Sequence, residues 1–170
     1  METLLGAMNK VRKQAPDVHL TLHGGGEYRK KLQDLVRQME LQEHVIFDTK
    51  FVKTEELPGI IRNAHLGVIP YRNGVFTGEI LPTKLLEYAA LGLPVICSRT
   101  QIIEDYFDET MVAFFTPDDV DDLADVILRL YKDRKQLDNL AQNIHEFNKK
   151  YNWSDQSSEY TNLIKNLIAN

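Results

Sequence analysis

The stretch Leu-Pro-Thr-Lys-Leu-Leu-Glu-Tyr-Ala-Ala-Leu-Gly-Leu-Pro-Val-Ile, residues 81–96, decides the fold class. Pro82 suits the first turn of a helix and Gly92 is a natural C-terminal stop, so the sequence predicts a helix over residues 82–91. The apolar run at 95–97 follows at once and predicts a short strand. A helix that leads directly into a short apolar strand is typical of α/β folds with parallel strands.

The same alternation of helix and strand runs through most of the chain. Each expected strand is a short, nearly continuous run of Val, Ile, Leu and Phe, which favours a parallel sheet buried on both faces. The expected strands are residues 18–22, 45–47, 66–69, 95–97 and 112–115, and the expected helices are residues 1–15, 28–39, 55–62, 82–91, 118–131, 134–151 and 155–168. The fold class is therefore α/β, doubly wound, with C-terminal helices. The pattern leaves open whether the last helix packs on the sheet or leaves the domain.

The bulk composition fits one compact domain. The chain has 170 residues, 43% of them hydrophobic and 26% charged, which is enough for one core but not for a second full domain. A net charge of -5 argues against nucleic acid as a partner. Cys97 is the only cysteine, so the sequence has neither a disulfide framework nor a cysteine cluster for a metal. No apolar run is long enough to span a membrane and no signal peptide is visible, so we expect a cytoplasmic domain.

A glycine-rich loop follows the first expected strand. Gly24, Gly25 and Gly26 come directly after His23 and before the next helix. Glycines permit positive φ angles and let a ligand approach the backbone, and ligands of doubly wound sheets bind at the carboxyl ends of the strands. The spaced glycines of a dinucleotide fingerprint are not matched, so the loop is either a ligand contact or a structural turn. We expect backbone contacts for the His23 side chain.

The first turn of the helix at 82–91 has side chains suited to a phosphate. Lys84 lies beside Thr83 where a cation is unfavourable for the helix dipole unless an anion is bound. Glu87 lies one turn further on, and its carboxylate can accept hydrogen bonds from both hydroxyls of a ribose. Glu79, in the preceding loop, can reach sugar hydroxyls. The alternative is that Glu87 and Lys84 form an ordinary surface ion pair and that Glu79 is solvated.

The spacing of these residues resembles a known motif. Glu79, seven intervening residues and Glu87, followed by residues 88–96, resemble the E-x7-E motif and the following helix and strand of family 4 (group 1) glycosyltransferases. Residues 20–26 are similar to the strand and glycine turn of that family, and residues 153–168 to its C-terminal helix. The resemblance implies that the chain is one Rossmann-like half of the two-domain GT-B fold, the half that binds the nucleotide-sugar donor.

The resemblance also implies a role for each motif residue. Glu79 corresponds to the glutamate that contacts the donor sugar and is the expected catalytic residue. Glu87 corresponds to the glutamate that binds the ribose. Thr83, Lys84 and Leu85 occupy the positions that hold the diphosphate. Because cationic side chains and a helix N-terminus stabilise the departing diphosphate in this family, the resemblance implies no metal and no cofactor.

The glycine turn and an aromatic segment complete the implied donor site. Gly24, Gly25 and Gly26 would face the sugar, and Phe51 and Val52 would border the nucleobase. We expect a retaining hexosyltransferase that acts in bacterial cell-surface polysaccharide or glycan synthesis. The residues do not single out a nucleobase, and we expect a UDP-sugar in preference to a GDP-sugar.

Two departures from the family limit what the chain can do alone. Pro82 has no N–H, which removes one potential phosphate donor, although Lys84 can replace it. The chain begins after the family's first strand and the Arg and Lys that follow it, and it lacks the N-terminal domain that binds a glycan or lipid-linked acceptor. We therefore expect the isolated chain to be inactive and the whole protein to be cytoplasmic or peripheral on the inner membrane face. The alternative is a non-catalytic Rossmann-like module for nucleotide binding or assembly.

Overall fold

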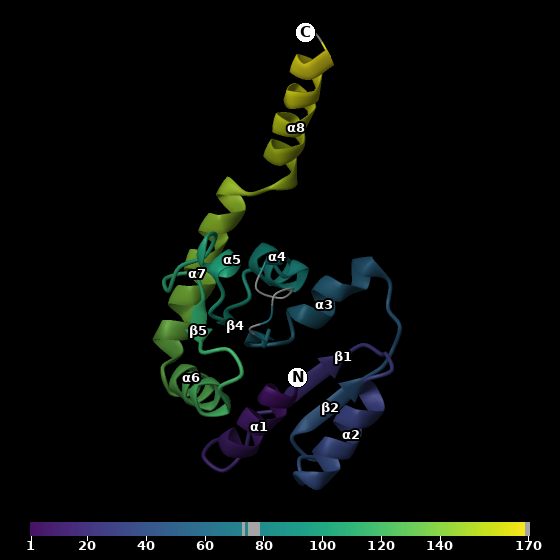
Figure 1. The fold of residues 1–170 in the computed structure, drawn as a ribbon. Coiled ribbons are helices and arrows are strands. Elements are labelled where there is room, and N and C mark those ends of the chain that lie inside the picture. The colour runs from purple at the N-terminus through teal and green to yellow at the C-terminus, as the bar shows by residue number, and fades with distance from the viewer. Residues whose placement is uncertain (73, 75–78, 169–170) are drawn as a thin grey trace.

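The computed structural model describes residues 1–72, 74 and 79–168, and helices alternate with strands along most of the chain (Figure 1). In chain order the elements are α1 (Glu2–Val11), β1 (Leu20–His23), α2 (Arg29–Gln38), β2 (Val45–Asp48), the 3-10 helix η1 (Thr54–Glu56), α3 (Leu57–Ile61), β3 (Gly67–Ile69), α4 (Thr83–Ala90), β4 (Val95–Ser98), α5 (Gln101–Glu104), β5 (Ala113–Phe115), α6 (Val120–Lys132), α7 (Arg134–Lys150) and α8 (Trp153–Ile168). All five strands lie where the sequence predicts them, and the α/β class is confirmed.

The five strands are parallel but form two sheets. β1 pairs with β2, with Leu20 opposite Val45, and β3, β4 and β5 form a second sheet in that order, with Gly67 opposite Val95. The sequence led us to expect one continuous sheet. Local patterning cannot reveal this difference, because each strand has the same apolar character whichever neighbour it pairs with.

The β3–β5 sheet is covered on both faces, as the sequence predicts. On one face Ile96 and Phe115 enter a core shared with α1 and α6. On the other face Val95, Cys97 and Phe114 enter a second core shared with α4 and α7. Burial raises the pKa of the Cys97 thiol well above its usual range, so this thiol is unreactive.

The β1–β2 sheet is covered on one face only. Leu20 and Val45 pack into the core with α1 and α2. On the opposite face Thr21 is exposed and Ile46 keeps 52% of its surface accessible. The prediction of a sheet buried on both faces is therefore wrong for these two strands.

Helix α4 is bounded nearly as the sequence predicts. Pro82 is the N-cap, with φ −64° and ψ 123°, so the helix begins one residue later than expected. Gly92 adopts φ 68° and ends the helix, which confirms its role as a stop signal. The carbonyl of Tyr88 accepts the N–H of Leu93 at 3.0 Å, which closes the turn into β4.

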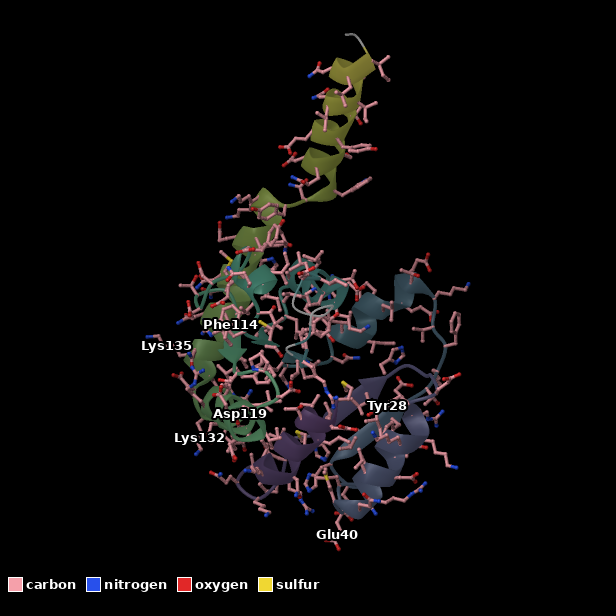
Figure 2. The ribbon with its side chains drawn as sticks, viewed as in Figure 1. Tyr28, Glu40, Phe114, Asp119, Lys132 and Lys135 are labelled. Carbon is pink, nitrogen blue, oxygen red and sulfur yellow. The ribbon has the colours of Figure 1, made fainter. Side chains whose placement is uncertain are left out.

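An acidic run marks the start of α6, where Figure 2 labels Asp119. The Asp119 side chain accepts hydrogen bonds from the N–H groups of Asp121 and Asp122, at 2.9 and 3.0 Å. The acidic run therefore consists of a helix cap, Asp119, and two acidic residues in the first turn, Asp121 and Asp122.

Three helices differ from expectation. Helix α1 ends at Val11, whereas the sequence predicts a helix up to residue 15. The helix expected at 55–62 is split into η1 and α3, because Pro58 lies where its ring and missing N–H favour a helix start. The short helix α5 was not predicted, since four residues give no apolar period. The last helix, α8, leaves the domain: it contains no buried residue, and Trp153 at its start is 83% exposed (Figure 1). Of the helices in the described residues, none is long and apolar enough to cross a membrane.

Candidate functional site

The loops singled out from the sequence follow the carboxyl ends of three strands. Residues 24–26 follow β1, residues 51–52 follow β2, and α4 comes after the loop that leaves β3. The Gly24 N–H donates to the Asp48 carbonyl at 2.9 Å, so the ends of β1 and β2 lie side by side. This is the edge at which parallel α/β sheets bind ligands, because loops and helix N-termini are gathered there.

The glycine loop has an open backbone. Gly24 and Gly26 adopt φ angles of 123° and 131°, which side chains rarely tolerate. A Cβ atom placed on Gly24, Gly25 or Gly26 would meet nothing within 4 Å. The positive φ angles account for Gly24 and Gly26, whereas neither packing nor backbone conformation explains Gly25, and the open backbone leaves room for a ligand to lie against it.

The histidine beside this loop has a different partner from the one expected. His23 Nδ1 lies 3.2 Å from Asp48 Oδ2, so its contact is a carboxylate rather than the backbone. The pKa of Asp48 is lowered, first by the hydrogen bond from the Lys50 N–H and then by His23. The pair joins the ends of β1 and β2.

The first turn of α4 presents its polar side chains to solvent. Thr83, Lys84 and Glu87 are exposed, whereas the Leu85 side chain is 0% exposed and packs in the second core. Only the backbone of Leu85 can therefore contact a ligand. Among the described residues, no side chain caps the N-terminus of α4, so its N–H groups and the positive end of its dipole can receive an anion.

The surface ion pair offered as an alternative reading is absent. Among the described residues, Lys84 and Glu87 do not form an ion pair within 4.0 Å. Glu79 lies in a bend and is exposed, close to residues 73 and 75–78, which are outside the described part of the chain. Phe51 is 100% exposed and Val52 is half-buried after β2, so an aromatic ring with no partner in the domain stands at the same edge.

A charged cluster at this edge was missed by sequence reasoning. The Glu2 carboxylate accepts hydrogen bonds from Lys31 Nζ at 2.6 Å, from the Tyr28 hydroxyl at 2.6 Å and from the Arg72 guanidinium at 2.7 Å. These hydrogen bonds lower the pKa of Glu2 to about 2, and the one from Lys31 has the largest effect. Arg72 also lies 3.7 Å from an Asp118 carboxylate oxygen. Arg72 is 70 positions away from Glu2 in the sequence, so the cluster is visible only in the folded structure.

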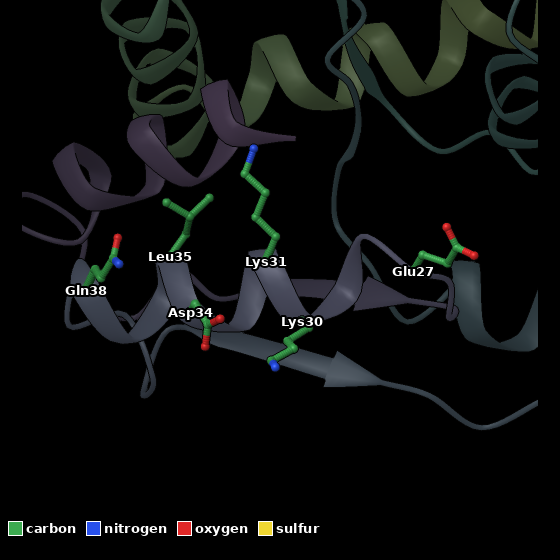
Figure 3. A pocket seen from close by; sticks show the side chains of 6 residues that line it. All are labelled: Glu27, Lys30, Lys31, Asp34, Leu35 and Gln38. Carbon is green, nitrogen blue, oxygen red and sulfur yellow. The ribbon is translucent and has the colours of Figure 1, made fainter.

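An open hollow of about 490 Å³ runs along α2, and Figure 3 shows the residues that line it. They are Glu27, Lys30, Lys31, Asp34, Leu35 and Gln38. None of the predicted donor-binding residues is among them. Because most of the lining comes from one face of a single helix, the hollow lacks the converging groups of a ligand site. In the described part of the chain, no group of His, Cys, Asp or Glu is arranged to hold a metal.

Comparison with known families agrees with this geometry. The profile described as glycosyl transferases group 1 matches residues 1–147, which is most of the chain. The chain belongs to this family of glycosyltransferases. The resemblance of residues 79–96 to the family motif is thereby confirmed at the level of the family.

The relatives that this chain matches are longer than the chain itself. It is 33% identical, over 101 residues, to the GDP-mannose-dependent alpha-(1-6)-phosphatidylinositol monomannoside mannosyltransferase of Mycolicibacterium smegmatis. That match covers 58% of this chain and 26% of the relative. The chain therefore spans about a quarter of the length of this relative.

Solved structures confirm the fold as half of a GT-B glycosyltransferase. The C-terminal domain of the group 1 glycosyltransferase LpcC from Francisella tularensis superposes with a TM-score of 0.72 at 22% identity, covering 87% of this chain and 76% of that one. HepE from Anabaena, in complex with UDP-glucose, gives a TM-score of 0.83 at 16% identity, covering 98% of this chain and 45% of HepE.

Proposed function

We propose that this chain is the donor-binding domain of a retaining, metal-independent glycosyltransferase that transfers a hexose from a nucleoside diphosphate sugar. The observation that supports this most is the N-terminus of α4. Within the described part of the chain it has no side-chain cap, and it presents Lys84 and Glu87 to solvent without pairing them with each other. A family member with such a helix end at the carboxyl edge of its sheet has the groups that a diphosphate and a ribose require.

In this proposal the donor lies along the carboxyl edge. The diphosphate binds the N–H groups of residues 83–85 and the Lys84 ammonium, and the ribose hydroxyls donate to Glu87. The exposed ring of Phe51 and the side chain of Val52 border the nucleobase. The sugar extends toward Glu79 and the open backbone of residues 24–26.

The same groups would assist the reaction. When the glycosidic bond to the diphosphate breaks, negative charge grows on the departing phosphate oxygen. The α4 dipole and the Lys84 ammonium would stabilise that charge, which is the usual source of rate enhancement in such sites. Glu79 is the proposed catalytic residue, because its carboxylate can hold the sugar hydroxyls while the bond breaks.

The acceptor and the biological setting also belong to the proposal. The chain spans about a quarter of the mannosyltransferase relative and under half of HepE, so the acceptor site would lie in the rest of a longer protein. We propose a glycan or lipid-linked acceptor, cell-surface polysaccharide or glycan synthesis, and a cytoplasmic location at the inner membrane face. Closure of the two domains would exclude water from the reacting sugar.

The nucleobase stays a prediction. The mannosyltransferase relative is named for GDP-mannose, whereas the HepE structure contains UDP-glucose. Our preference for a UDP-sugar is directly testable, because the base is the only part of these two donors that would meet Phe51 and Val52.

Isothermal titration calorimetry tests the proposed function. We would titrate UDP, GDP, ADP, NAD and the common UDP- and GDP-sugars into the chain, into Glu87→Gln and into Lys84→Ala. Because a hydrogen bond to a charged group contributes about 1.5–3 kcal/mol, each change should weaken the preferred nucleotide by roughly 10- to 100-fold. Asp125→Asn and Lys135→Ala are matched controls, since both residues are exposed and lie on helices α6 and α7, which contribute no residue to the proposed site.

Three outcomes are possible. Selective binding of one nucleoside diphosphate that weakens in both site variants supports the proposal and identifies the base. Binding of NAD or ADP in preference favours a non-catalytic nucleotide-binding module. Binding that is unchanged in Glu87→Gln and Lys84→Ala would contradict the proposed site.

A further inference from the structure

Asp48 connects three groups at the carboxyl ends of β1 and β2. Its backbone carbonyl accepts the Gly24 N–H at 2.9 Å. One of its carboxylate oxygens accepts the Lys50 N–H at 3.2 Å, and the other lies 3.2 Å from His23 Nδ1. Because His23 and Asp48 are also opposite each other in the strand register, the imidazole is held between the glycine loop and the segment that leads to Phe51.

The contact with Asp48 determines which ring nitrogen of His23 carries the proton. The pKa of Asp48 is lowered, first by the hydrogen bond from the Lys50 N–H and then by His23, so the carboxylate is ionised at neutral pH and can only accept. Nδ1 must therefore be the donor in this contact. In a neutral imidazole only one nitrogen carries a hydrogen, so Nε2 of His23 has a lone pair and is an acceptor.

Nε2 of His23 is open to a ligand. In the described part of the chain it makes no hydrogen bond, and 24% of the side chain is accessible. His23 lies on the exposed face of β1, because Leu20 and Leu22 alternate with it and pack against the core. The two ring nitrogens point in different directions, so the bond from Nδ1 to Asp48 leaves Nε2 for another partner.

The chemistry of Nε2 favours a ligand with an N–H group. Phosphate oxygens are acceptors, so a neutral imidazole with its lone pair on Nε2 does not bind them. Phe51 follows Asp48 closely in the chain and its ring is 100% exposed, which suits stacking on a flat nucleobase. Proteins read a stacked base by hydrogen bonds at its edge, where uracil and guanine present a ring N–H. Cytosine and adenine present a lone pair at the corresponding position.

We propose that His23 is a specificity residue for the nucleobase of the donor, whose ring N–H, in uracil or guanine, donates to Nε2. Asp48 is the positioning residue that keeps the proton on Nδ1. This inference rests on the proposed function, because it requires a nucleoside diphosphate at the carboxyl edge. Cytosine and adenine would place a second lone pair against Nε2, so the site disfavours CDP and ADP. Stacking on Phe51 is common to all four bases and does not select among them.

Calorimetric titration of UDP, CDP, GDP and ADP tests the proposal. His23→Phe keeps a flat ring but removes the acceptor. His19→Phe is the matched control, because His19 is an exposed histidine before the amino end of β1 and bonds the Asp17 carbonyl. In the parent chain we expect UDP to bind more tightly than CDP, or GDP more tightly than ADP, by roughly 3- to 10-fold, the effect of one neutral hydrogen bond. In His23→Phe the preference should disappear, and in His19→Phe it should persist.

Nitrogen-15 NMR of the His23 ring tests the role of Asp48 without relying on ligand binding. The ring shifts distinguish a proton on Nδ1 from a proton on Nε2, and we expect the Nδ1–H form in the parent chain. Asp48→Asn can still accept the Lys50 N–H, but its amide can also donate to Nδ1, so the Nε2–H form should appear and the base preference should fall. A proton on Nε2 in the parent chain would overturn the proposal.

The titrations separate this inference from the proposed function. A base preference that disappears in His23→Phe alone supports the inference. Binding that weakens in Glu87→Gln but keeps its base preference in His23→Phe overturns the inference and leaves the proposed function standing. A loss in His23→Phe that is confined to the sugar conjugates assigns His23 to the sugar and also overturns the inference. If none of the four nucleotides binds, the proposed function and the inference fail together.

Discussion

The β3–β5 half and the β1–β2 half of the molecule differ in how completely they are covered. In the first, alternate residues of β4 and β5 enter separate cores on the two faces of the sheet. In the second, one face packs on α1 and α2 while Thr21 and Ile46 on the other face are exposed. β1 also has an unpaired edge among the described residues.

This difference teaches where stability and function are located. The β3–β5 half holds α4 by burying Leu85 and Ala89, so the helix end that we assign to the diphosphate has rigid support. The β1–β2 half contributes the glycine loop and Phe51, which make few contacts within the domain. We therefore expect substitutions in the first half to change folding and those in the second to change ligand binding.

The largest effect should come from matched phenylalanines. Phe115→Ala removes a ring that is almost fully buried in β5 and should lower the free energy of unfolding by about 3–5 kcal/mol. Phe51→Ala removes a fully exposed ring and should change it by less than about 0.5 kcal/mol. Urea denaturation measures both. Similar losses in the two variants would refute the contrast between the halves.

Substitutions of two glycines should differ less in their effect on the free energy of unfolding. Gly92 has φ 68°, and an added Cβ would collide with the His145 ring, so Gly92→Ala should cost about 1–2 kcal/mol. Gly25 has open space around it and no positive φ, so Gly25→Ala should leave the free energy of unfolding within about 0.5 kcal/mol. Thermal unfolding of both variants checks this. A larger loss at Gly25 than at Gly92 would mean that the glycine loop is structural.

The helix that covers β5 can be weakened at its cap. Asp119→Ala removes the acceptor for two N–H groups at the start of α6 and should lower the free energy of unfolding by about 1 kcal/mol. Asp125→Ala, on an exposed position of the same helix, is the control. Urea midpoints that fall equally in both variants would argue against the cap.

The smallest effect concerns Glu2, which links the two halves. Its folded pKa, about 2, is below its ordinary value of 4.5, so its contribution is fully present above pH 4.5 and is lost as the pH falls to about 2. Glu2→Gln should therefore be less stable than the parent protein at pH 7 and equally stable near pH 2. Unfolding curves measured at several pH values give the difference in stability between the two proteins. A difference that persists at pH 2 would contradict the assigned pKa.

Much of the fold could be predicted because local patterns determine it. The apolar runs located all five strands, and Pro82 and Gly92 bounded α4 to within a residue. The split into two sheets could not be predicted, because edge pairing depends on which strands are neighbours in space. The exposed face of β1 and β2 was missed for the same reason: Val45, Ile46 and Phe47 form an apolar run although Ile46 faces solvent.

The candidate site could be predicted in part. The sequence placed Thr83, Lys84 and Glu87 on one helix end, and the structure exposes all three. The contacts among Glu2, Lys31 and Arg72 could not be foreseen, because they join three elements that are distant in the chain. Leu85 shows the limit of motif reasoning, since its side chain belongs to the core and only its backbone is available.

The most direct test of the donor-site assignment is to map nucleotide binding by amide NMR. UDP and GDP would be titrated into the labelled chain while the resonances of every assigned amide are followed. The account predicts that the largest shifts occur at residues 24–26, 51–52 and 83–87. Shifts concentrated along α2, at Lys30, Asp34 and Gln38, with none at 83–87, would contradict it.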